Sequence, residues 1–191
     1  MPRFTRAQLE AFRDQPVPDL IGDDCRLLIV GINPGLWTAA TQTHFCHPSN
    51  RFYPALRTAG LIHWGLDTAT GITPGQRQGF TATGMGITNL VNRATARASE
   101  LSADELEAGG RRLVDLAQRM SPSVIAIAGV TAYRTAFQRP GAVLGEQEEG
   151  IGPAATWVIP NPSGLNAHVT VADLAGWLRK VADIAGVGSG L

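Results

Sequence analysis

Two asparagines that precede prolines are the residues of this sequence best placed to do chemistry. Asn33 and Asn161 each follow a short apolar run, at residues 26–32 and 156–159. An amide does not titrate, but it can accept a hydrogen bond from water and donate one to a carbonyl. Such a residue suits a reaction that needs a positioned water molecule and a good leaving group. Alternatively, each Asn-Pro pair is only the turn that ends a strand.

Short apolar strands separated by helices must position these asparagines. The runs at 26–32, 124–128 and 156–159 have the length and composition of buried parallel strands, and 86–90 is a candidate short strand. Helical spacing and capping residues predict helices at 6–13, 49–59, 102–120, 131–138 and 171–184. A long loop is expected after Gly35, and residues 65–88 have no clear pattern apart from that candidate strand.

This alternation predicts an α/β fold: a three-layer α/β/α sandwich with a short, mainly parallel central sheet. Ligands of such folds bind outside the carboxyl ends of the strands, where both Asn-Pro pairs lie. The length of 191 residues predicts one domain. We place it at residues 25–185, after an N-terminal extension at 1–24 and before a flexible tail at 186–191.

The formal net charge is zero, with 16 basic and 16 acidic residues. The distribution is uneven, because the segment 25–99 holds six arginines and one aspartate, a charge of 6 − 1 = +5. A polarised surface can attract a polyanion although the net charge is nil. The balanced total therefore does not exclude a nucleic-acid partner, for which we expect few phosphate contacts and a modest salt dependence.

The sequence predicts no membrane partner, no metal and no cofactor. No apolar run approaches the roughly 20 residues of a membrane span, and no secretory signal is visible, which predicts a cytoplasmic protein. Cys25 and Cys46 are then expected to be free thiols. Phosphate-loop, dinucleotide-binding and Gly-x-Ser-x-Gly motifs are missing.

Four motifs, in order along the chain, resemble those of one enzyme family. They are GINPG at 31–35, F-x-H-P-x-N-R-F at 45–52, GITNLV at 86–91 and NPSGL at 161–165. Together they are similar to the mismatch-specific uracil/thymine DNA glycosylases, a branch of the uracil-DNA glycosylase superfamily. The resemblance covers roughly residues 25–185.

The resemblance implies a DNA repair enzyme of base excision, a monofunctional glycosylase and hydrolase. It would flip uracil, and also thymine or a modified cytosine, from opposite guanine in damaged double-stranded DNA and hydrolyse the N-glycosidic bond. Asn33 would position the attacking water, and Phe45 would stack on the flipped base. Superfamily members with a stronger activity carry Asp where this chain has Asn33, which implies slower chemistry. Further base-contacting positions are Ile32, Thr38, Asn89 and Asn161.

The resemblance also implies a set of DNA-binding residues. Leu165 matches the residue that enters the duplex and fills the space left by the flipped base. Arg51 is either a phosphate contact or an ordinary surface charge. Relatives tend to carry Arg, which reads the opposite guanine, where this chain has Ala167, so we expect weaker discrimination between G·U and A·U pairs. The DNA-binding set is Asn50, Arg51, Ser163, Gly164, Leu165, Asn166 and His168.

Three other functions stay open at this stage. One is a broader glycosylase that acts on deaminated purines or on uracil in any context. Another is a mismatch-binding protein with weak or no catalysis. The third is an α/β enzyme that acts on free pyrimidine nucleosides. We expect a monomer in each case.

Overall fold

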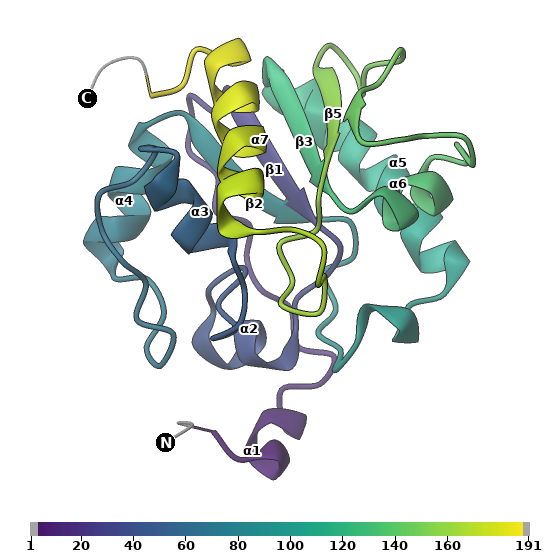
Figure 1. Cartoon of the computed structure of the whole chain (residues 1–191). Coiled ribbons are helices and arrows are strands. Elements are labelled where there is room, and N and C mark those ends of the chain that lie inside the picture. Colours follow the sequence, from purple (N-terminus) through teal and green to yellow (C-terminus); the bar gives the residue numbers. More distant parts are fainter. Residues whose placement is uncertain (1–3, 189–191) are drawn as a thin grey trace.

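The computed structural model describes residues 4–188, and its centre is a five-stranded sheet (Figure 1). The strand order is β2-β1-β3-β5-β4, and only β4 is antiparallel to its neighbour. The strands are β1 (Leu27–Gly31), β2 (Met85–Asn89), β3 (Val124–Ala128), β4 (Gly145–Glu146) and β5 (Ala155–Ile159). The three apolar runs that the sequence marks as buried strands are β1, β3 and β5, and they are neighbours in the sheet.

Helices cover both faces of the sheet, which confirms the predicted three-layer α/β/α sandwich. One face packs against α3 (Phe52–Thr58), α4 (Pro74–Ala82) and α7 (Val171–Ile184). The other packs against α5 (Ala103–Met120) and α6 (Val130–Ala136). At the carboxyl end of the strands lie α2 (Leu36–Thr41) and, beyond it, α1 (Arg6–Glu10) (Figure 1). A single turn of 3₁₀ helix spans Ala98–Glu100.

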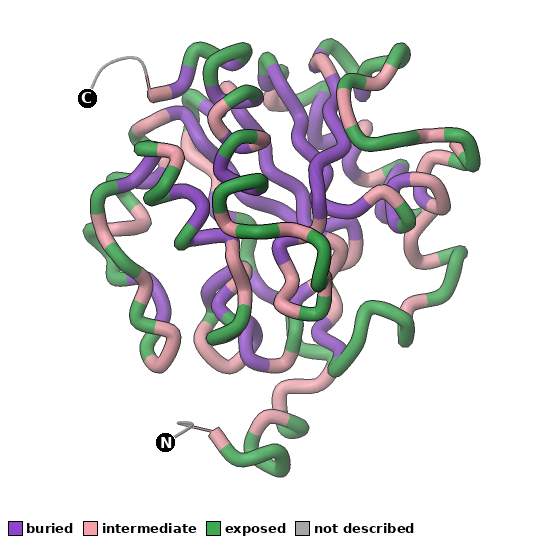
Figure 2. The backbone as a smooth tube through the Cα atoms, in the orientation of Figure 1, coloured by how far each residue is buried: buried purple, intermediate pink, exposed green. Residues whose placement is uncertain are grey.

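Alternating side chains of the central strands supply the two cores. In β1, Leu27 and Ile29 face the α3–α7 side, whereas Leu28 and Val30 face the α5–α6 side. Both faces of a parallel sheet are buried in this way, which explains why the strand reads as a continuous apolar run. Figure 2 shows this buried centre beneath more exposed helices and loops.

Two glycines bring α5 close to its neighbours. A Cβ atom built on Gly109 would lie 2.3 Å from the carbonyl oxygen of Leu90, and one on Gly110 would lie 2.4 Å from that of Ala136. Both contacts are with backbone, which cannot rotate away as a side chain can. Residue types without a Cβ are therefore required at this crossing.

Helix α7 has the bounds that its pattern predicts, and α5 begins at the predicted capping box of Ser102 and Glu105. Other boundaries differ. The helix expected at 49–59 begins only at Phe52, the expected loop after Gly35 contains α2, and α4 was not predicted. A capping box of Thr73 and Gln76, with Pro74 between them, marks the start of α4 in the sequence.

Segments outside residues 25–185 also pack against the domain. Leu20 pairs with Ile87 of β2, and the Val17 amide donates to Asn92 Oδ1 over 2.9 Å. Val17 and Val187 are fully buried. Residues 1–3 and 189–191, which belong to the proposed extension and tail, lie outside the described residues. No helix of the described chain is long and apolar enough to cross a bilayer.

Candidate active site

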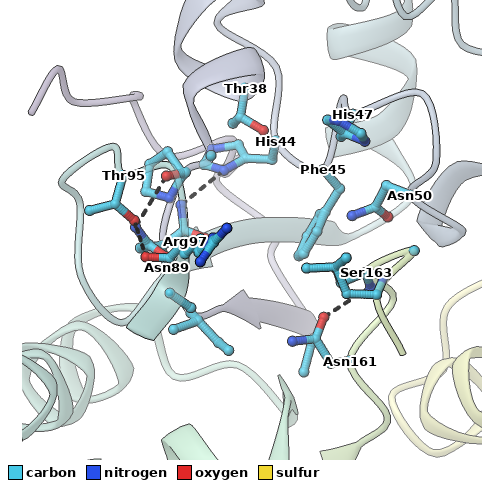
Figure 3. A pocket seen from close by; sticks show the side chains of 18 of the residues that line it. Thr38, His44, Phe45, His47, Asn50, Asn89, Thr95, Arg97, Asn161 and Ser163 are labelled. Carbon is cyan, nitrogen blue, oxygen red and sulfur yellow. Dashed lines mark hydrogen bonds between the residues drawn. The ribbon is translucent and has the colours of Figure 1, made fainter. Parts of the chain in front are cut away.

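A pocket of about 650 Å³ opens at the carboxyl end of the sheet (Figure 3). That volume lies within the usual range for small-molecule sites, about 300–1,000 Å³. Asn33 and Asn161 both reach it, although β3 lies between β1 and β5 in the sheet. The residues predicted from sequence that line it are Ile32, Asn33, Thr38, Phe45, Asn50, Asn89, Asn161, Ser163, Gly164, Leu165 and Asn166.

The amide of Asn33 is held by its nitrogen. Nδ2 lies 2.9 Å from the carbonyl oxygen of Arg93, 2.8 Å from Thr95 Oγ1 and 3.1 Å from the carbonyl oxygen of Pro34. A backbone carbonyl can only accept, so the NH₂ group must point this way and the orientation of the amide is fixed. Oδ1 is then the atom of Asn33 left to accept a hydrogen bond from a molecule in the pocket.

Sequence reasoning missed the segment that holds Asn33. Thr95 accepts from Asn33 and donates to the carbonyl oxygen of Arg97 over 2.8 Å, so its hydroxyl hydrogen is already used. The Arg93 side chain pairs with Asp14 and Glu105 at 2.8 Å each, which secures the same segment from the outside. Its guanidinium lowers the pKa of Glu105 to about 2.

Phe45 forms one wall of the pocket. Its ring lies 4.3 Å from that of Phe52, centroid to centroid, and is half-buried against the core. The backbone of Phe45 has a φ of +56°, a strained value for a residue with a side chain. A Cβ atom on Gly31 would lie 3.1 Å from Phe45 Cζ and 2.4 Å from Asn89 Oδ1. Glycine at the end of β1 therefore lets both side chains close over it.

The buried side chain of His44 orients Asn89. His44 Nε2 lies 2.9 Å from the carbonyl oxygen of Pro18, so that nitrogen carries the proton. Nδ1 must then accept, and it does so from Asn89 Nδ2 over 3.2 Å. Burial lowers the pKa of His44, which keeps the ring neutral. The sequence offered no role for His44, and its contact with Pro18, 26 residues away, has no local signal.

The other predicted base-contacting residues come from three elements. Thr38 lies on α2 and is buried, Ile32 directly follows β1, and Asn161 follows β5. Gly129, directly after β3, lies between Ile32 and Asn161. A Cβ atom built on it would be in contact with both, 3.4 Å from Ile32 Cδ1 and 3.7 Å from Asn161 Nδ2. Asn161 Oδ1 accepts from the amide of Ser163 over 2.9 Å, which fixes the start of the following loop.

Residues 163–168 form a loop at the rim of the pocket, here called the rim loop. Leu165 is 92% exposed, the most exposed of the large hydrophobic residues in the described chain. Asn166 donates its backbone amide to the Ser163 carbonyl and its side-chain Nδ2 to the Asn161 carbonyl. His168 is exposed and is not part of the pocket lining.

Two residues of the predicted DNA-binding set make internal contacts. Asn50 Oδ1 accepts from the amide of Phe52 over 2.9 Å, at the start of α3. Arg51 lies beside the pocket, and one guanidinium nitrogen donates to the carbonyl oxygens of Ser163 and Asn166. The phosphate contacts expected for these residues stay predictions.

No carboxylate lines the pocket among the described residues, so its charge comes from Arg97 at the mouth. Arg97 is exposed and has no ion-pair partner in residues 4–188. Only some of the arginines in the segment 25–99 lie near the pocket. Arg26 precedes β1, at the opposite end of the sheet, and Arg93 is neutralised by its two carboxylates.

The cysteines and histidines of the described chain form no metal site. In the described chain no three His, Cys, Asp or Glu side chains are grouped so that they could hold a metal ion. Cys25 and Cys46 are buried and free, and burial raises the pKa of Cys25 to about 11. His47 lines the pocket, and its Nδ1 lies 2.8 Å from Ser49 Oγ.

Comparison with known proteins identifies the family. The model of the Uracil DNA glycosylase superfamily matches residues 18–181. The chain belongs to this superfamily. The fold is also similar to the solution NMR structure of a "putative Uracil DNA glycosylase" from Methanosarcina acetivorans, with a TM-score of 0.56 and 15% sequence identity over 88% of this chain and 98% of that one. The superfamily match includes the segment from Pro18 to Leu20, which lies before the domain boundary that we placed at residue 25.

Proposed function

We propose that this protein is a monofunctional DNA glycosylase that removes uracil from opposite guanine in duplex DNA. One observation carries the proposal: Asn33, anchored through Nδ2 with Oδ1 unused, shares a single pocket with the aromatic Phe45 and the amide of Asn89. Membership of the superfamily supports the reaction class. The resemblance and this geometry support the residue roles that we propose.

In the proposed reaction, Asn33 Oδ1 accepts a hydrogen bond from a water molecule and holds it near C1′ of the flipped nucleotide. The water oxygen bonds to C1′ as the C1′–N1 bond breaks, and the bonding pair leaves with the base. The water proton ends on the base or in solvent. The products are free uracil and an abasic sugar with a hydroxyl group on C1′.

The pocket has no acidic side chain among its described lining residues, and this affects the expected reaction rate. The sugar has oxocarbenium character in the transition state, and an acidic side chain would offset that charge. Because no described lining residue carries a negative charge that could offset the cationic sugar, the rate must depend on how well the base leaves. Uracil leaves as a stabilised anion. We therefore expect slow turnover and a steep dependence on the acidity of the base at N1.

The rim loop supports action on duplex DNA rather than on free nucleosides. An exposed leucine beside a pocket for one nucleotide suits insertion into a base stack, a device that many DNA-bending and base-flipping proteins use. Leu165 is exposed because nothing in the described chain covers it. A nucleoside hydrolase would have no use for such a side chain at its rim.

A glycosylase that also cleaves the strand needs an amine to form a Schiff base with the sugar. The only lysine of the chain is Lys180, whose Nζ lies 4.6 Å from the ring centroid of Trp157. Lys180 is not part of the pocket lining. This arrangement supports a monofunctional enzyme.

Recognition of the opposite base is expected to be loose. Ala167 is exposed in the rim loop, and its side chain offers no donor or acceptor for the edge of guanine. The carbonyl oxygens of Ser163 and Asn166 are already engaged by Arg51. We propose that G·U is preferred over A·U mainly because its pairing is weaker, which lowers the cost of flipping.

The test is excision from labelled duplexes that carry uracil, thymine or a modified cytosine opposite guanine or adenine. Strand breaks are read after alkali, with untreated samples as the control for lyase activity. The proposal predicts uracil excision, alkali-dependent breaks and no product from Asn33→Ala, while that variant still binds the G·U duplex.

Each alternative gives a different result in the same panel. Preferred excision of hypoxanthine or xanthine would indicate the broader specificity. Binding of the G·U duplex without any excision would indicate a mismatch-binding protein. Release of uracil from deoxyuridine but not from DNA would indicate a nucleoside hydrolase. Normal excision by Asn33→Ala would contradict the assigned chemistry.

A further inference from the structure

We propose that Arg51 is a positioning residue that holds the rim loop in the shape needed to unstack DNA. The proposal rests on the proposed function, because it assigns a role within base flipping. It replaces the phosphate contact or plain surface charge that the sequence predicts for Arg51. The sequence contains no sign of it, since the partners are backbone atoms more than 110 residues away.

The contacts of Arg51 span the rim loop. Its Nη1 donates to the carbonyl oxygen of Ser163 over 2.9 Å and to that of Asn166 over 3.1 Å. The backbone amide of Arg51 donates to the carbonyl oxygen of Pro162 over 2.9 Å. One residue of the α3 start therefore ties three carbonyls that precede and follow Leu165. Hydrogen bonds from a charged donor are stronger than those between neutral groups.

A second contact presses the loop onto the same segment. A Cβ atom on Gly164 would lie 2.4 Å from Ser49 Oγ and 2.7 Å from the carbonyl oxygen of Ser49. The loop backbone therefore rests directly on residue 49, two positions before Arg51. The loop also closes on itself through the amide of Leu165, which donates to Ser163 Oγ over 3.3 Å.

These contacts explain how Leu165 can stay 92% exposed on an ordered loop. An apolar side chain at the tip of a free loop would turn toward the protein, and the loop would have to be ordered again on each encounter with DNA. Ordering a loop costs conformational entropy for each residue that becomes fixed. A loop that is already ordered avoids this cost, so more of the free energy of its DNA contacts is available to unstack the target nucleotide.

The experiment measures single-turnover excision by Arg51→Gln from three duplexes, with uracil opposite adenine, opposite guanine and opposite an abasic-site analogue. They differ in how strongly uracil is held in the stack. We expect the ratio of the A·U rate to the unpaired rate to fall by about 10- to 100-fold, the effect of losing hydrogen bonds to a charged group. Fluorescence of 2-aminopurine beside the uracil should show less unstacking, and Arg51→Lys should restore part of it.

Arg57→Gln is the matched control, because Arg57 lies on the same helix and its side chain is exposed and without an ion pair in residues 4–188. It removes the same charge but leaves the rim loop intact, so the ratio should not change. Leu165→Ala should reproduce the loss seen with Arg51→Gln. If Arg51→Gln lowered the excision rate equally on all three duplexes, and if the salt dependence of its DNA binding fell by about one counterion, Arg51 would be a phosphate contact. That result would overturn the proposal.

A second variant covers the case in which Arg51→Gln unfolds. Gly164→Ala leaves Arg51 intact but must displace the loop from Ser49, so it should lower the same ratio. An unchanged ratio in Gly164→Ala, with a shifted loop shown by NMR, would contradict the inference. If the wild-type protein excises no uracil from any duplex, the proposed function fails, and that result is distinct from a failure of the role of Arg51.

Discussion

Asn33→Asp tests the anchoring of the amide to which we assign the attacking water. Superfamily members with a stronger activity resemble this variant, so chemistry alone would predict faster excision, since a carboxylate offsets the cationic sugar. The structure predicts the opposite. Nδ2 of Asn33 faces the carbonyl oxygens of Arg93 and Pro34, and a carboxylate oxygen in its place would face the same two acceptors.

The cost can be worked out from the partners. The carbonyl of Pro34 keeps the amide of Thr95 as a donor, but that of Arg93 loses the only side-chain donor found for it in the described chain. An acceptor left unpaired costs about 1–3 kcal/mol. Repulsion between the oxygens raises the pKa of the introduced carboxyl group, and a pKa raised by one corresponds to about 1.4 kcal/mol. We expect the free energy of unfolding at pH 8 to fall by about 2–4 kcal/mol.

The stability of Asn33→Asp relative to wild type should decrease as the pH rises. Since the folded-state pKa of the introduced carboxyl group is raised above the unfolded value of about 3.9, the variant is least destabilised below that value. It loses stability as the pH rises through the folded-state pKa, because the protonated acid still donates one hydrogen bond and the carboxylate donates none. The excision rate relative to wild type should likewise be highest at low pH.

Urea denaturation at pH 5 and pH 8, with single-turnover excision at both, provides the measurement. Asn92→Asp is the matched control, because Asn92 uses Oδ1 to accept from Val17 and a carboxylate can do the same. That variant should stay within about 0.5 kcal/mol of wild type. If Asn33→Asp is as stable as wild type at pH 8 and excises uracil faster, the reasoning from the amide anchor is wrong.

Three further predictions concern single residues. Because burial lowers the folded-state pKa of His44, the free energy of unfolding should fall as the pH drops below about 6.5, by up to about 1.4 kcal/mol for each pH unit. Urea denaturation should show that the stability of His44→Asn depends less on pH in this range. Arg97→Gln should reduce the slope of log K against log salt for DNA binding by about one, whereas Arg119→Gln, at the far end of α5, should leave it unchanged. Gly110→Ala should lower the free energy of unfolding by at least about 2 kcal/mol through its backbone clash, but Gly176→Ala, in the open part of α7, should raise it by about 0.5–1 kcal/mol.

The predictions from sequence were most accurate where the signal is local. The apolar runs of β1, β3 and β5 follow directly from burial of both sheet faces, and the capping box at Ser102 marks the start of α5. Helix α2 was missed because its six residues follow Gly35, which provides no side-chain cap. A helix this short depends on tertiary packing for its stability.

The sequence by itself determined the fold class and the identity of part of the pocket lining. Asn33, Phe45, Asn89 and the rim loop sit in motifs whose spacing could be compared with a known family. The strands that precede Asn33 and the rim loop are marked by composition. An α/β sheet brings the carboxyl ends of its strands to one edge, so their convergence follows from the fold class.

Only the tertiary structure decided how those residues are held. Asn33 depends on a carbonyl oxygen 60 residues away, Asn89 on a histidine that Pro18 orients, and the rim loop on Arg51. In each case at least one of the partners is a backbone atom. Every residue type has the same carbonyl, so no sequence pattern marks which of them will accept a hydrogen bond. The orientation of each amide, and hence the atom it presents to the pocket, is settled only when distant segments pack together.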